Sequence, residues 1–240
     1  MLFRSTAGYP ELNSTLELIA ALEKNGADMI ELGMPYSDPL ADGPVIQQSS
    51  FEALQLGMSI DLLFKQLFDF RKRIHLPVVL MGYLNPVLQY GFEKFCAQAA
   101  AIGIDGLIIP DLPSHEYQQL YGPIVKKYGL DFIFLITPET SEARVRHLDE
   151  LSTGFLYAVS SSSTTGKEKD FNAVVNYLKK LNSYQLQNPL LVGFGIKDKN
   201  TLQVVTPYVE GAIIGSAFIA ALKTDSSLAS ITKRFMEKLK

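Results

Sequence analysis

Short apolar runs alternate along the chain with longer segments in which apolar residues recur every three or four positions. The runs are continuous, which is typical of strands that are buried on both faces of a parallel sheet. The predicted strands are Leu2–Thr6, Asp28–Gly33, Val78–Gly82, Gly106–Pro110, Phe132–Thr137, Phe155–Val159, Leu190–Gly193 and Ala212–Gly215. The predicted helices are Thr15–Asn25, Ile60–Ile74, Phe92–Ile102, His115–Tyr128, Glu142–Leu151, Phe171–Leu181, Asn200–Val205, Ala217–Leu222 and Leu228–Leu239. This alternation predicts an α/β protein with helices covering a parallel sheet.

A weak internal repeat favours a closed barrel. Gly26-Ala27-Asp28, Gly103-Ile104-Asp105 and Gly129-Leu130-Asp131 each follow a helix and open a strand. Their spacing fits a strand–helix unit of about 26 residues, and eight such units predict one (β/α)8 barrel, a TIM barrel, over residues 1–240. Short extra helices are expected in its βα loops. The alternative is a doubly wound open sheet, which would need a glycine-rich fingerprint after the first strand, and Thr6-Ala7-Gly8-Tyr9-Pro10 is not one.

The composition limits which binding partners and which cellular compartment fit this protein. The 240 residues are 47% hydrophobic and 20% charged, with a net charge of −3, which argues against nucleic acid or an acidic membrane as a partner. Cys96 is the single cysteine, so no intramolecular disulfide is possible. No signal peptide is visible, and no apolar run approaches the roughly 20 residues that span a bilayer. The sequence predicts a cytoplasmic protein.

Two acids stand at the end of the second predicted strand. Glu31 lies within an apolar run, on the strand face that it shares with Met29 and Gly33, and Asp42 follows eleven residues later. A buried, unpaired carboxyl group has a raised pKa, which is typical of a residue that transfers protons. A structural carboxylate that accepts hydrogen bonds from a neighbouring loop fits the same pattern. The residues alone leave both interpretations open.

Glycines at the last two strand ends indicate a phosphate site. Gly193, Gly195 and Gly215 allow close approach of the backbone, and Ser216 opens a short helix whose first N–H groups can donate to an anion. Loops after strands 7 and 8 commonly bind phosphate in this barrel. Since no Lys or Arg sits at these strand ends, backbone dipoles and Ser216 would hold the anion.

The sequence lacks the residues that metal-dependent, Schiff-base or serine-nucleophile catalysis requires. The three histidines, His75, His115 and His147, lack metal-ligand spacing, and no strand lysine suits a Schiff base. No Gly-x-Ser-x-Gly motif is present. Two carboxylates, a tyrosine and a phosphate cradle remain, which suit proton transfer on a phosphorylated substrate.

The segment from Glu31 to Pro44, ELGMPYSDPLADGP, closely resembles the signature of the tryptophan synthase α-subunit family. The resemblance continues at Thr6–Pro10, Tyr83, Asn85-Pro86, Asp111–Pro113, Tyr157, Thr165-Gly166, Gly193–Ile196 and Gly215–Ala217. It implies a carbon–carbon lyase of tryptophan biosynthesis that cleaves indole-3-glycerol phosphate into indole and glyceraldehyde 3-phosphate. It also implies an α2β2 complex whose β subunit carries pyridoxal phosphate and consumes the indole, with no cofactor or metal in this chain.

The same resemblance assigns roles to individual residues. It makes Glu31 the residue that transfers protons and places Asp42 against the indole N–H. The implied substrate-binding residues are Tyr157, Thr165, Gly166, Phe194, Gly195, Gly215 and Ser216. The implied contacts with the β subunit are Pro35, Asp38 and Pro113.

Three features depart from the family pattern. The sequence opens almost at the first predicted strand, so the N-terminal helix expected of the family is not expected here. Arg4 stands where an apolar pocket residue is expected, and Ser161 and Ser163 occupy positions at which many members carry Arg and Gly. Two other hypotheses about function stay open. The protein could be another phosphate-binding barrel enzyme (a pentose-phosphate epimerase or an indole-glycerol-phosphate synthase), or a subunit that binds ligand without catalysis.

Overall fold

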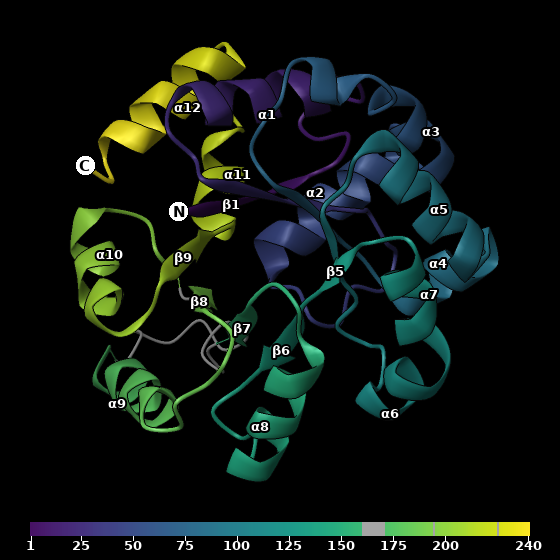
Figure 1. The fold of residues 1–240 in the computed structure, drawn as a ribbon. Helices are drawn as coiled ribbons and strands as arrows, with labels where there is room; N and C mark the ends of the chain where they lie inside the picture. Colours follow the sequence, from purple (N-terminus) through teal and green to yellow (C-terminus); the bar gives the residue numbers. More distant parts are fainter. Residues whose placement is uncertain (160–170, 194, 225) are drawn as a thin grey trace.

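The computed structural model describes residues 1–159, 171–193, 195–224 and 226–240. In it, the chain forms a barrel of parallel strands inside a ring of helices (Figure 1). The strands are β1 (Leu2–Thr6), β2 (Met29–Gly33), β3 (Val78–Met81), β4 (Gly106–Ile108), β5 (Asp131–Phe132), β6 (Phe134–Ile136), β7 (Leu156–Val159), β8 (Leu190–Gly193) and β9 (Gly211–Ile214). Their order is β5-β4-β3-β2-β1-β9-β8-β7-β6, and every pairing is parallel.

The two ends of this order are one continuous stretch of chain. Only Ile133 separates β5 from β6; β5 pairs with β4, and β6 pairs with β7. The N–H of Ile133 donates to the carbonyl of Leu107 at 3.0 Å, which continues the pairing with β4. β5 and β6 are therefore the two halves of the fifth barrel strand, and the sheet closes through them. The predicted (β/α)8 barrel is confirmed, and the open doubly wound sheet is excluded.

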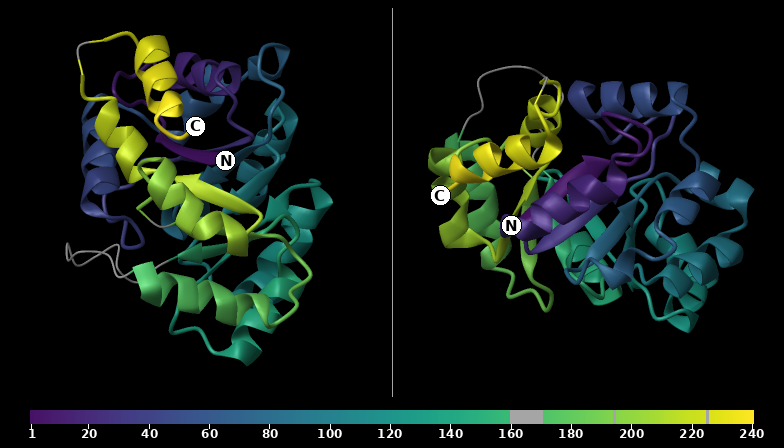
Figure 2. Two further views of the ribbon diagram at one scale, coloured as in Figure 1. Left: turned by 90° about the vertical axis from the view of Figure 1, so that its left-hand side faces the viewer. Right: turned by 90° about the horizontal axis from the view of Figure 1, so that it is seen from above.

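The helices are α1 (Thr15–Lys24), α2 (Pro44–Gln55), α3 (Ile60–Gln66), α4 (Leu84–Tyr90), α5 (Phe92–Ile102), α6 (Ser114–Glu116), α7 (Gly122–Lys127), α8 (Glu142–Leu151), α9 (Phe171–Asn182), α10 (Lys199–Val205), α11 (Ser216–Ala221) and α12 (Leu228–Glu237). A π-helical segment, Tyr117–Tyr121, joins α6 to α7. In Figures 1 and 2, α12 lies beside α1, and the two chain ends lie on the same side of the molecule.

Two local predictions about helices were wrong. The segment predicted as one helix over Ile60–Ile74 is α3 followed by a turn of 3₁₀ helix, Phe70–Lys72. Ser14 and Glu17 have the spacing that predicts a capping box at the start of α1. The box is not formed, because Ser14 already has helical backbone angles and its hydroxyl donates to the carbonyl of Glu11 at 2.7 Å. Extra helices in the βα loops were predicted, but α2 and α4 were not located in the sequence.

Alternate strand residues face opposite sides of the barrel wall. The interior contains Leu2, Val79, Met81, Ile108, Ile133, Phe155, Tyr157 and Ile213. Ile30 and Leu32 pack outside it, with the helices, so Glu31 between them faces the interior. The sequence predicted that Glu31 shares one strand face with Met29 and Gly33, and the structure shows that this face points into the barrel.

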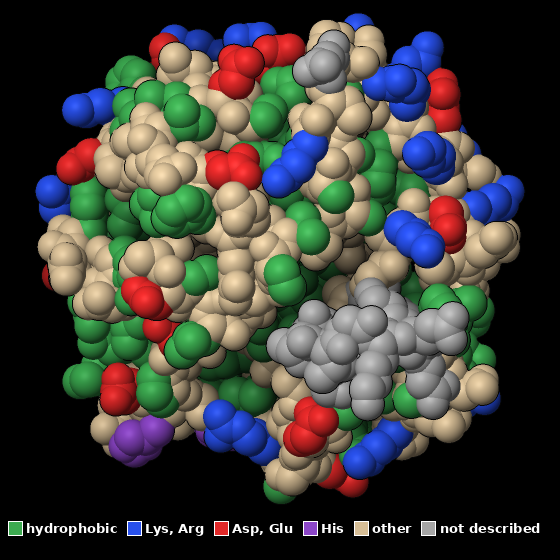
Figure 3. All heavy atoms as spheres, turned by 180° about the vertical axis from the view of Figure 1, so that it is seen from behind, with side chains coloured by type: hydrophobic (Ala, Val, Ile, Leu, Met, Phe, Trp, Pro, Cys, Tyr) green, Lys and Arg blue, Asp and Glu red, His purple; other side chains and the backbone are tan. Residues whose placement is uncertain are grey.

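The surface is mixed in character. In the space-filling view of Figure 3, Lys, Arg, Asp and Glu side chains lie mostly toward the outline, and hydrophobic or uncharged atoms occupy much of the middle. Within the described parts of the chain, no helix has the length and apolar character needed to cross a membrane. Among those same residues, no group of His, Cys, Asp and Glu side chains has the arrangement of a metal site.

Candidate active site

Glu31 is the most deeply buried acid of the described residues. It lies in β2 with no exposed surface, and neither carboxylate oxygen accepts a hydrogen bond from any described residue. The nearest charged group is the guanidinium of Arg4, whose Nε lies 3.2 Å from Oε1 of Glu31. A buried carboxyl group with no hydrogen-bond donor is poorly stabilised as an anion.

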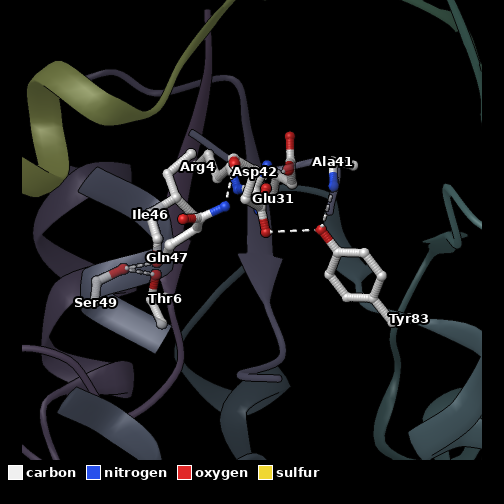
Figure 4. Close-up of polar contacts among 9 residues, drawn as sticks. All are labelled: Arg4, Thr6, Glu31, Ala41, Asp42, Ile46, Gln47, Ser49 and Tyr83. Atoms are coloured by element: carbon white, nitrogen blue, oxygen red, sulfur yellow. Dashed lines mark hydrogen bonds and ion pairs between the residues drawn. The ribbon is translucent and has the colours of Figure 1, made fainter. Parts of the chain in front are cut away.

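Arg4 reaches Glu31 because the two are register partners on adjacent strands. β1 pairs with β2 so that Arg4 stands opposite Glu31, and both side chains enter the barrel. The same guanidinium pairs through Nη2 with Oδ1 of Asp42 at 2.5 Å. Arg4 therefore bridges the two acids that the sequence singled out (Figure 4).

Asp42 is held in place by its backbone as well as by its side chain. It lies in the loop between β2 and α2, where its N–H donates to the carbonyl of Pro39 at 3.0 Å. The side-chain amide of Gln47, in the first turns of α2, donates to the carbonyl of Asp42 at 2.9 Å. The hydroxyl of Tyr83 donates to Oδ2 at 3.0 Å. These contacts fix the direction of the Asp42 carboxylate, which is almost completely buried.

Burial and neighbouring charges set the protonation of the cluster. Burial, opposed by Arg4 and assisted by Asp42, raises the pKa of Glu31 to about 7. Burial by itself lowers the pKa of Arg4, but Asp42 and Glu31 outweigh it, so the net shift is upward and the guanidinium stays charged. Glu31 can therefore exchange a proton near neutral pH, as a general acid or base must.

Tyr157 of β7 completes the cluster inside the barrel. It is buried, and burial together with Glu31 raises the pKa of its hydroxyl, which keeps it protonated. Its ring also explains Gly193 on the neighbouring strand. A Cβ at Gly193 would lie 2.6 Å from Cε2 of Tyr157, so the glycine makes room for this ring. The sequence had attributed Gly193 to close approach of a phosphate.

The predicted phosphate residues lie at two strand ends. Gly195 is exposed and has a φ of +39°, a conformation that favours glycine. Gly215 precedes α11, and Ser216 is the exposed first residue of that helix. A Cβ at Gly215 would lie 3.4 Å from Cβ of Arg4, which brings the start of α11 next to the carboxylate cluster. Thr165, Gly166, Phe194 and the serines at 161 and 163 lie outside the described residues.

The residues predicted to contact a partner lie on the surface near the site. Asp38 and Pro113 are exposed, and Pro35 is half-buried. Leu40, in the same loop as Asp38, is 90% exposed. The segment that buries Asp42 thus presents an apolar side chain outward.

Two members of the cluster were missed as site residues. Arg4, like Glu31, is a charged residue within an apolar strand, which marks it as a candidate. From the sequence it was interpreted only as a departure from the family pattern. Tyr83 lies two residues after β3, at a strand end where barrel enzymes place functional groups, but no role of its own was assigned to it from the sequence. The pairing of Arg4 with both acids depended on strand register, which the sequence did not give.

The fold and this cluster define a parallel α/β barrel with a buried acid–base site at its centre. The family model for the tryptophan synthase alpha chain matches residues 4–240. The alpha chain of Flavobacterium psychrophilum is 52% identical over 229 residues, covering 95% of this chain and 90% of its own length. That of Parabacteroides distasonis is 50% identical over 236 residues, covering 98% and 92%.

Solved structures agree. The tryptophan synthase A-subunit of Pyrococcus furiosus superposes with a TM-score of 0.91 at 32% identity, covering 100% of this chain and 96% of that one. A tryptophan synthase complex of the same organism contains a chain that superposes with a TM-score of 0.89, covering 99% and 96%. The chain belongs to the tryptophan synthase alpha chain family.

Proposed function

We propose that Glu31 and Asp42 carry out the reaction of this family, the cleavage of indole-3-glycerol phosphate to indole and glyceraldehyde 3-phosphate. The observation that carries the assignment of roles is the pair itself. Glu31 is fully buried with no hydrogen-bond donor among the described residues, whereas the carboxylate of Asp42 is oriented by Arg4 and Tyr83. Glu31 transfers the protons, and Asp42 stabilises the positive charge that develops on the indole ring.

The chemistry accounts for both roles. A proton delivered to C3 of the indole produces an indolenine cation. This cation accepts the electron pair of the breaking bond between C3 and the glycerol carbon, which restores the aromatic ring. The hydroxyl on that carbon loses its proton as the aldehyde forms. One group that both donates and accepts a proton suffices, and Glu31 has the burial and the raised pKa for it.

Asp42 suits a different role because its environment differs. Its carboxylate accepts hydrogen bonds from Tyr83 and Arg4, so it is already oriented before substrate enters. A fixed negative charge next to the ring N–H stabilises the indolenine cation more than the neutral ground state, and such preorganised charge accelerates the reaction.

The phosphate is assigned to the loops after the last two strands. Gly215, Ser216 and Gly195 would hold it, with Thr165, Gly166 and Phe194 assigned by resemblance alone. The N–H groups at the start of α11 have no partner within the helix, which supports this placement. Tyr157 would then line the pocket between the phosphate and the carboxylates.

We also infer an α2β2 complex with a β subunit that carries pyridoxal phosphate and uses the indole. The solved complex of the relative supports a partner. The surface around Asp38 supports its position, because a groove of about 490 Å³ lies between the loop and α2 and is lined by Tyr36, Asp38, Leu40 and Phe51, among others. We place Pro35, Asp38 and Pro113 at this contact. Binding there would act directly on the loop that holds Asp42.

The experiment is a direct assay of indole release from indole-3-glycerol phosphate by the purified chain, alone and titrated with a β subunit. Cleavage that the β subunit increases supports the proposal. In the Glu31→Gln variant, which keeps the shape but cannot transfer protons, the rate should fall at least about 10²-fold. Glu17→Gln, which changes an exposed acid of α1, is the control. No cleavage by the unmodified chain, with or without the partner, would favour a subunit that only binds ligand.

A further inference from the structure

Arg4 is a buried cation that has no role of its own in the reaction proposed above, where it serves only as one of two hydrogen-bond donors to Asp42. It comes from the middle of β1, and its side chain is 7% exposed. Within the described parts of the chain, it is the only cationic group in an ion pair with either Glu31 or Asp42. Keeping a guanidinium inside a barrel is costly unless its charge is matched, and here two carboxylates match it.

The groups that face this cation come from five parts of the fold. They are Glu31 from β2, Asp42 from the loop after it, Tyr83 from the end of β3, Tyr157 from β7, and the backbone of Gly215 before α11. Both tyrosines are protonated, since burial raises the pKa of each hydroxyl. The charged members are therefore one cation and two acids.

We propose that Arg4 is a positioning residue for the cleavage reaction: its guanidinium bridges the two acids, directs the Asp42 carboxylate and supplies the counter-charge of the Glu31 carboxyl group. The inference rests on the proposed roles of Glu31 and Asp42. Arg4 would act on the reaction only by positioning Glu31 and Asp42, and it would not contact the reacting atoms.

Removal of the cation has a defined physical consequence. Two buried carboxyl groups would then face each other without a counter-charge, and one of them would stay protonated to higher pH. Glu31 is the one that changes, because no described donor bonds to it, whereas Asp42 still accepts from Tyr83. Among the described residues, Arg4 is the only neighbouring charge that lowers the pKa of Glu31.

The chain offers a matched control at the opposite end of the barrel. Arg71 pairs with Asp105 and donates to the carbonyls of Gly103 and Leu76, each at 2.7 Å, near the amino ends of β3 and β4. Arg71→Met therefore removes a bonded arginine of similar size without touching the carboxylate cluster.

The experiment compares Arg4→Met, Arg4→Lys and Arg71→Met in the full chain. The pKa of Glu31 is measured by carbon-13 NMR titration of labelled glutamate carboxyl groups, with the Glu31 signal assigned by its loss in Glu31→Gln. The pH profile of kcat/KM is measured in parallel. Because the titration needs no substrate, it reports on Arg4 even if the chain fails to cleave indole-3-glycerol phosphate. That failure would count against the proposed function alone.

In Arg4→Met the Glu31 titration should move upward by about one unit or more, and the corresponding limb of the pH profile should move with it. Arg4→Lys keeps the charge and should leave the titration within about half a unit. A single ammonium lacks the planar fork that bridges two carboxylates, so its kcat should fall about tenfold with little change in KM. Arg71→Met should shift neither the titration nor the profile.

An unchanged Glu31 titration in Arg4→Met would overturn the proposal, as would an equal shift in Arg71→Met. If Arg4→Met does not fold, Arg4→Lys decides the matter. Unchanged kcat in that variant would show that the bridge has no positioning role, and an increase would show that Arg4 obstructs the site.

Discussion

The hydroxyl of Tyr83 donates a hydrogen bond to Oδ2 of Asp42 at 3.0 Å, on the opposite side of the carboxylate from Arg4. The same hydroxyl accepts the backbone N–H of Ala41 at 3.1 Å, so one atom holds both the side chain of Asp42 and the loop next to it. Tyr83 is in turn stacked on Tyr36, with ring centroids 5.2 Å apart. The orientation of Asp42 thus depends on a residue 41 positions away.

Tyr83→Phe should lower kcat about fivefold and leave the fold intact. The substitution removes one hydrogen bond to a buried carboxylate, worth about 1 kcal/mol, and retains the stacked ring. Steady-state kinetics on the purified variant test this. Tyr36→Phe, which removes the hydroxyl of the neighbouring ring, is the control and should retain its kcat. A loss of similar size in both variants would show that the hydrogen bond from Tyr83 to Asp42 is not what sets kcat, because both variants keep the stacked rings and only Tyr83→Phe removes that bond.

Asp42→Asn should reduce kcat by about 10²-fold or more while KM changes only a few-fold. The amide keeps the size of the carboxylate but not its charge, and the charge has its largest effect as the indolenine cation forms. Asp69→Asn, the same substitution at an exposed acid, is the control and should change neither kcat nor KM. If Asp42→Asn raised KM with kcat unchanged, Asp42 would be a binding residue.

The raised pKa of Glu31 predicts how stability depends on pH. The pKa is about 7 in the folded chain against an ordinary 4.5, so the folded state binds this proton more tightly than the unfolded state. The stability that the proton confers is complete below pH 4.5 and is lost as the pH rises to about 7, a difference of about 3 kcal/mol. Above pH 7 no further change arises from this group.

Urea unfolding of the wild-type chain and of Glu31→Gln at a series of pH values measures this dependence. The free energy of unfolding of the variant, relative to wild type, should rise between pH 4.5 and 7 and then level off. A constant difference across that range would mean that Glu31 titrates at its ordinary pKa in the folded chain.

Gly215→Val should weaken the binding of glycerol phosphate, whereas Gly215→Ala should be tolerated. The backbone at Gly215 has a φ of −116°, which any residue adopts, and a single Cβ would make ordinary contacts with Arg4 and Ile46. The additional methyl groups of valine would extend into the space beside the start of α11. Calorimetric titration with glycerol phosphate and with free indole distinguishes a local effect from misfolding, since only the phosphate ligand should lose affinity.

The strands could be predicted because a strand that is buried on both faces is a continuous run of apolar residues. β1 and β8 have the predicted bounds, and other strands differ by a residue or two at their ends. The helix α2 was not located because its buried face contains Ser49 and Ser50 beside Ile46 and Ala53, which weakens the apolar period. Ser49 is buried because its hydroxyl bonds to that of Thr6 in β1 at 2.7 Å (Figure 4), a tertiary contact.

By itself, the sequence determined the parallel barrel and the strand face that Glu31 shares with Met29 and Gly33, because alternation along a strand assigns each side chain to a face. Only the tertiary structure decided that this face is the barrel interior and which groups Glu31 meets there. Strand register places Arg4 opposite Glu31, and closure of the barrel brings Asp42, Tyr83 and Tyr157 to the same point from separate loops and strands. A local pattern cannot specify these pairings, because they depend on how distant segments are aligned, and that alignment is set by packing of the whole core.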